Sequence, residues 1–116
     1  MHLSQLFRQG IVMPLSDEAE MALRYEDVDR QTPVEFLKIS DEIFLQLWFH
    51  GVIRAMRDHC GVPFNEYETD IIETDRVPDL KRAIAKPVNV SPEFMAALSS
   101  LIQKAVSLHR PLFFVL

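Results

Sequence analysis

The feature that most constrains the fold is the C-terminal run 112–116, in which five apolar residues follow Pro111 without a polar break. A run of this length and composition predicts a short buried strand. Such a strand needs a hydrogen-bonding partner elsewhere in the chain. Residues 11–13 and 67–72 are the two candidates. The first of these is an apolar triplet directly before Pro14, which is typical of a short edge strand.

Capping signals predict that most of the remaining chain is helical. Ser16, followed by acidic residues, predicts a helix over 17–28 with Met21, Tyr25 and Val28 on one apolar face. Similar signals predict helices over 2–9 with Gly10 as a C-cap and over 41–60 behind Ser40, and a short helix behind Thr32-Pro33-Val34-Glu35. They also predict a short helix from Pro78 through Ala85, and a helix that begins at Ser91-Pro92 and is broken by Pro111.

Two segments allow a second interpretation. Residues 34–39 also fit a strand, but neither alternate face is cleanly apolar, so the capping box favours a helix. Residues 64–76 fit either an extended acidic loop or an exposed strand in which Tyr67, Thr69 and Ile71 alternate with acids.

The helix predicted over 41–60 carries one polar stripe, and its other residues from Ile43 to Ile53 are apolar except Gly51. An apolar arc that wide predicts a helix buried on most sides, at the centre of the core. The alternative is a partner groove in which Trp48 and Phe49 act as anchors.

Length and composition predict a single compact domain over residues 1–116, because 116 residues with 48% hydrophobic and 25% charged side chains are ordinary for one globular unit. The same numbers exclude disorder of the whole chain. The elements together predict an α+β fold, predominantly helical, with a small sheet that includes the C-terminal strand. An all-α fold is the alternative.

Cys60 is the single cysteine, which excludes an internal disulfide framework and fits a reducing compartment. The N-terminal residues lack a signal-peptide pattern, and no apolar run approaches the ~18 residues of a membrane helix. These observations predict a soluble cytoplasmic protein without a membrane partner.

The net charge of −5 conceals two acidic segments, 15–29 and 66–79, each with six acids and one base. Each segment therefore carries −5, while the remaining ten bases and five acids carry +5. The overall charge excludes free nucleic acid as a favoured partner. The two segments are either solvated faces or, if they converge in space, a negative surface that steers a basic partner.

No catalytic, metal or cofactor residue is predicted. Cys60 follows His59, but adjacent helical residues point about 100° apart and cannot form a nucleophilic pair by themselves. The acids of 66–75 lack the central glycine of a calcium loop, whose place Ile71 and Ile72 occupy. Three classes of function remain, namely a protein-binding inhibitor, a small enzyme with a carboxylate-based site, and a structural or oligomeric interaction subunit.

The two acidic segments, together with the lack of a catalytic motif, make the chain similar in character to small bacterial toxin-immunity proteins, which bind and block a cognate toxin. The resemblance implies a protein partner, namely a toxin domain that is often a basic nuclease. It also implies that acidic side chains occupy the place of substrate phosphates.

The candidate partner-binding residues are acids from both segments, with one tyrosine as an aromatic anchor. The second segment contributes Glu66, Tyr67, Glu68, Asp70, Glu73 and Asp75, and the first contributes Asp17, Glu18, Glu20, Asp27 and Asp29.

Overall fold

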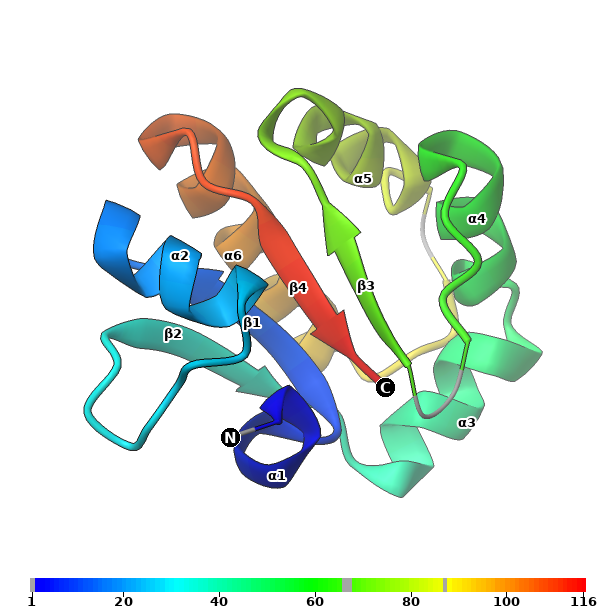
Figure 1. The fold of residues 1–116 in the computed structure, drawn as a ribbon. Helices are drawn as coiled ribbons and strands as arrows, with labels where there is room; N and C mark the ends of the chain where they lie inside the picture. Colours follow the sequence, from blue (N-terminus) through cyan, green and yellow to red (C-terminus); the bar gives the residue numbers. More distant parts are fainter. Residues whose placement is uncertain (1, 66–67, 87) are drawn as a thin grey trace.

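The computed structural model describes residues 2–65, 68–86 and 88–116, and its strands form a four-stranded antiparallel sheet. The strands are β1 (Gly10–Pro14), β2 (Val34–Lys38), β3 (Thr69–Ile72) and β4 (Leu112–Val115), in the order β2-β1-β4-β3 (Figure 1). The predicted C-terminal strand is confirmed, and both of its candidate partners pair with it. Because β1 lies between β2 and β4, the edge position expected for residues 11–13 is wrong.

Helices cover both faces of this sheet. They are α1 (Leu3–Phe7), α2 (Asp17–Arg24), α3 (Asp41–Phe49), α4 (Val52–Cys60), α5 (Val77–Ala83) and α6 (Pro92–Leu108), with a 3₁₀ turn, η1 (Thr74–Arg76), before α5. Figure 1 shows α1 and α2 in front of the sheet and α6 behind it. The fold is therefore α+β and predominantly helical, as expected. The radius of gyration, 13.2 Å, equals the ~13 Å typical of a compact chain of this length.

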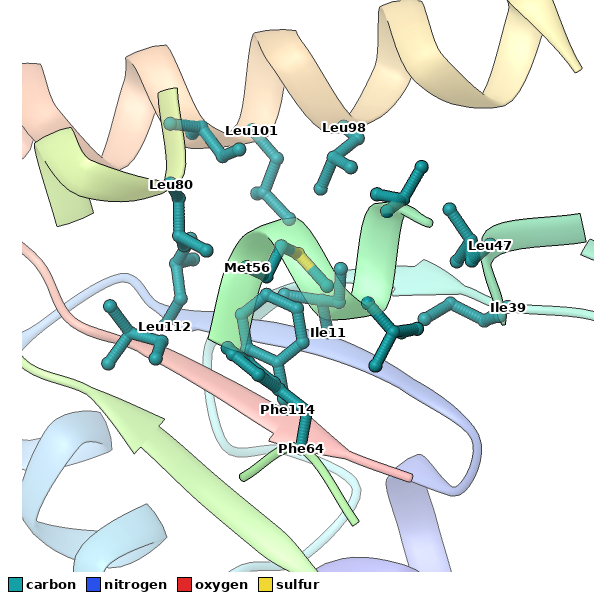
Figure 2. Close-up of a cluster of buried hydrophobic side chains, with 14 of the residues drawn as sticks. Ile11, Ile39, Leu47, Met56, Phe64, Leu80, Leu98, Leu101, Leu112 and Phe114 are labelled. Carbon is teal, nitrogen blue, oxygen red and sulfur yellow. The ribbon is translucent and has the colours of Figure 1, made fainter. Parts of the chain in front are cut away.

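The sheet separates two apolar clusters, which explains why β1 and β4 are apolar at consecutive positions rather than alternate ones. Ile11, Phe114 and Leu112 face the larger cluster, where they meet α3, α4, α5 and α6. Figure 2 shows this cluster, with Leu98 and Leu101 of α6 opposite the strands. The smaller cluster lies beneath α1 and α2 and contains Val12, Phe113, Val115, Leu3, Phe7, Leu23 and Val28.

Three of the predicted N-caps are confirmed. The hydroxyls of Ser16, Ser40 and Ser91 accept hydrogen bonds from the backbone N–H groups of the third residues of α2, α3 and α6, at 3.1, 3.1 and 3.3 Å. Each bond satisfies one amide at a helix end that has no partner within the helix. None of the described helices is long and apolar enough to cross a membrane.

The short helix predicted behind Thr32-Pro33-Val34-Glu35 is wrong, because Val34–Lys38 form β2 along β1. The hydroxyl of Thr32, the expected cap, instead accepts the backbone N–H of Asp29 at 3.0 Å and so closes a turn before the strand. Ladder bonds to β1 and contact of Phe36 with Phe7 then outweigh the local helical signal.

The helix predicted over 41–60 is two helices, because Gly51 adopts a left-handed conformation (φ +77°) between α3 and α4. Burial on most sides is also wrong. Leu45, Trp48 and Phe49 are 53%, 48% and 77% exposed. Phe44 and Leu47 are the fully buried residues of α3, and Ile43 packs against the same cluster while only partly buried.

The first acidic helix is shorter than predicted, since α2 ends at Arg24 and Glu26 then takes a positive φ of 54°. Met21 and Tyr25 are exposed, so the apolar face expected for them is wrong, although Val28 is buried. Gly10 does not cap α1, whose C-cap residue is Arg8, but begins β1.

Candidate protein-binding face

Arg24, at the end of α2, joins the two acidic segments. Its guanidinium donates to both carboxylate oxygens of Glu73, at 2.6 and 3.1 Å, and its Nε donates to Glu20 at 3.2 Å. The hydrogen bond to Glu73 is the largest cause of a raised pKa at Arg24, and it lowers the pKa of Glu73. A partly exposed ion pair contributes about 1 kcal/mol or less, so the bidentate geometry mainly fixes position. The ends of α2 and β3 are thereby held together.

Arg110, which follows α6, binds the other end of α2. Its Nη1 donates to Asp17 at 2.6 Å and lies 3.5 Å from Glu20. Arg24 and Arg110 together therefore engage three of the predicted partner-binding acids, namely Asp17, Glu20 and Glu73. The surface is consequently less negative than the acid count alone predicts.

A pocket of about 430 Å³ lies where the two segments meet α1 and the end of β4. Glu26 of the first segment and Glu68 of the second both line it, together with Arg8. Glu26 accepts a 3.1 Å hydrogen bond from the His2 ring, whereas the exposed side chain of Glu68 makes no ion pair among the described residues. We call Asp17, Glu20, Glu26, Glu68 and Glu73 the acidic face.

The other described acids of the two segments make different contacts or are simply exposed. Glu18 and Asp29 line a shallow pocket between α2 and the turn before β2, where Asp29 accepts the backbone N–H of Gln31 at 2.8 Å. Asp27 and Asp75 are exposed. Asp79 at the start of α5 pairs with Arg76 and Arg82. Glu66 and Tyr67 lie outside the described residues, so the proposed aromatic anchor stays a prediction.

The side chain of Asp70 lies on the face of the sheet away from α1 and α2. The side chains of β3 alternate, and Asp70 shares its face with Ile72 of the larger cluster. It accepts backbone hydrogen bonds from Phe64 and Asn65, while its Oδ2 is buried without a partner among the described residues. Burial is the main cause of its raised pKa, with the charge of Glu68 adding to it and that of Arg57 opposing it. Asp70 therefore holds the backbone of residues 64–65 rather than joining the acidic face.

Cys60 is a buried free thiol at the end of α4. Burial raises its pKa from 9.0 to about 11, and the charge of Asp79 adds to this effect. The nucleophilic thiolate is therefore scarce at neutral pH. Among residues 2–65, 68–86 and 88–116, no group of three or more His, Cys, Asp or Glu side chains could hold a metal ion.

We expect the native protein to react with a thiol reagent such as DTNB at pH 8 at least about a hundredfold more slowly than the urea-unfolded chain. The rise in pKa from 9.0 to about 11 alone lowers the thiolate fraction by about that factor, and burial restricts access further. Stopped-flow labelling of both states measures the ratio. Equal rates would contradict this account of Cys60.

Sequence reasoning missed the two arginines that organise the acidic face. Arg24 had a local signal, because it lies four residues after Glu20, a spacing that pairs side chains on a helix. Its bond to Glu73 spans 49 residues, and the bond from Arg110 to Asp17 spans 93, so neither could be found from local patterns.

No protein-family model, curated protein or solved structure matches this chain.

Proposed function

We propose that this chain is a protein-binding inhibitor of the immunity type, which neutralises a basic, nuclease-like toxin domain in the cytoplasm by covering it with the acidic face. The observation that carries the proposal is the bond between Arg24 and Glu73, which holds carboxylates from two distant segments on one surface. Such convergence is what distinguishes a steering surface from two unrelated solvated segments.

The contacts within the acidic face support this role in a second way. Because Arg24 and Arg110 already fix Asp17, Glu20 and Glu73, these carboxylates lose little side-chain freedom when a partner binds. Glu68 is exposed at the rim of the adjoining pocket and makes no ion pair among the described residues. Glu68 is therefore the carboxylate of this face best placed to meet a cationic side chain of the toxin. There it would take the place of a phosphate of the toxin's substrate.

We expect Glu68→Lys to weaken binding of the basic partner at least about tenfold, because the reversal removes one attractive charge and adds a repulsive one. The experiment uses the immobilised chain to capture proteins from native cells. The captured protein is then purified, and its affinity is measured by calorimetry at low and high salt. Addition of the chain should also suppress the nuclease activity of that protein.

Glu42→Lys provides the matched control, since Glu42 is an exposed acid in the first turn of α3, distant in sequence from both acidic segments. It changes the net charge by the same amount and should leave affinity within about twofold. The proposal fails if the affinity is indifferent to salt and to Glu68→Lys, or if both reversals weaken binding equally. A captured protein without toxin activity would retain the binding role but contradict inhibition.

A further inference from the structure

A second surface, separate from the acidic face, lies at the junction of α3 and α4. Leu45, Trp48 and Phe49 are spaced i, i+3 and i+4 on α3 and are all substantially exposed. Trp48 and Phe49 line a groove of about 570 Å³ with Gly51, Ile53, Arg54, Arg57 and Asp58. We call these seven lining residues the aromatic groove, and Leu45 lies beside it on α3. It shares no lining residue with the pocket between Glu26 and Glu68.

The arginines of the aromatic groove differ from most others in the chain. Arg24, Arg76, Arg82 and Arg110 all form ion pairs. In the part of the chain that the structure describes, no ion pair involves Arg54 or Arg57. The groove therefore keeps two cations without bound carboxylates on a chain whose net charge is −5.

Arg57 is already positioned for recognition. Its guanidinium lies over the Trp48 ring, 5.0 Å from the centroid, and its Nε donates to the carbonyl oxygen of Pro63. A guanidinium stacked on an indole keeps outward donors for a carboxylate while losing little freedom on binding. Tryptophan, arginine and neighbouring aromatic side chains are also the residues that dominate binding energy at protein interfaces.

We propose that the aromatic groove binds an acidic amphipathic segment of a protein partner, whose apolar side chains pack on Leu45, Trp48 and Phe49 and whose carboxylates meet Arg54 and Arg57. Charge complementarity selects this occupant. A second copy of the chain, docked symmetrically, would bring four arginines together against two Asp58 carboxylates. An inorganic anion would leave the exposed apolar stripe of α3 uncovered.

Trp48 is the single tryptophan of the chain and reports directly on the groove. The probes are a short amphipathic helical peptide built from leucine and glutamate, and the same peptide with lysine at every glutamate. We expect saturable change in Trp48 fluorescence with the glutamate peptide, and at least about tenfold weaker binding of the lysine peptide.

Phe49→Ala and Arg54→Gln should each weaken the glutamate peptide about tenfold or more, whereas Leu108→Ala, an exposed apolar residue on α6, should leave its affinity unchanged. Circular dichroism of each variant checks that the fold is retained. Glu68→Lys should also have no effect on this peptide, which separates the groove from the acidic face.

Four results would overturn the proposal. The first is the absence of saturable binding, and the second is equal affinity for the two peptides. The third is self-association of the free chain in sedimentation experiments that Phe49→Ala abolishes, since that result would assign the groove to a second copy. Anionic lipid vesicles serve as a further probe. A change in Trp48 fluorescence with the vesicles but not with the glutamate peptide is the fourth result, because it would indicate a membrane rather than a protein partner.

Discussion

Removal of residues 112–116 is expected to abolish cooperative folding. These residues include β4, which lies between β1 and β3 and pairs with both. Every side chain from Leu112 to Leu116 is at most 2% exposed, and the strand contributes to both apolar clusters. Loss of one buried phenylalanine side chain alone costs about 3–5 kcal/mol, and a domain is stable by only about 5–15 kcal/mol. The truncated chain should aggregate or remain unfolded, as measured by circular dichroism and thermal melting.

A conservative change in the same strand is the control for this truncation. Phe114 packs edge-on against Phe64, with ring centroids 4.9 Å apart. Phe114→Leu keeps the strand apolar and should cost only about 1–2 kcal/mol, so it should still melt cooperatively. A truncated protein that melts at the wild-type temperature would contradict the expectation that folding requires β4.

Local chemistry made the helix starts predictable, whereas pairing across the sheet decided the places where prediction failed. Ser16, Ser40 and Ser91 act within three residues, so each cap can be recognised from sequence alone. Residues 32–35 form a capping box, yet residues 34–38 pair as a strand with β1, 20 to 28 residues earlier. Gly51 was the visible signal that the long helix is broken, because glycine readily adopts the left-handed conformation found there.

The candidate site was predictable as a region of negative charge but not as a surface. The acid counts located the two segments correctly along the chain, and Glu26 and Glu68 do line one pocket. The fold brings Arg24 and Arg110 to some of these acids and not to others. The number of acids left unpaired therefore cannot be obtained from composition. Asp70 shows the same limit, because strand alternation puts its side chain on the face of the sheet away from α1 and α2, where the backbone of residues 64–65 binds it.

Gly10→Ala is expected to destabilise the protein by about 3 kcal/mol and to lower Tm by roughly 10 °C or more. Gly10 begins β1 opposite Lys38, and a Cβ placed there would lie 2.6 Å from Cζ of Phe36 and 2.7 Å from the carbonyl oxygen of Leu37. The phenylalanine ring could rotate away, but the carbonyl belongs to the β2 backbone. Urea titration of both proteins measures the difference in the free energy of unfolding.

Two further variants separate the possible causes of that loss, namely crowding by the Phe36 ring, crowding by the Leu37 carbonyl, and backbone strain. Phe36→Ala removes the ring but leaves the Leu37 carbonyl, so combining it with Gly10→Ala should recover only part of the lost stability in a double-mutant cycle. Gly51→Ala tests strain without crowding, since no atom lies within 4 Å of its added Cβ although φ is +77°; it should cost about 1–2 kcal/mol. If Gly10→Ala lowers the free energy of unfolding no more than Gly51→Ala does, the close approach of β2 is not the reason that position 10 requires glycine. A larger cost at Gly10, partly relieved by Phe36→Ala, would establish that the missing side chain at Gly10 allows residues 34–38 to pair as a strand beside β1.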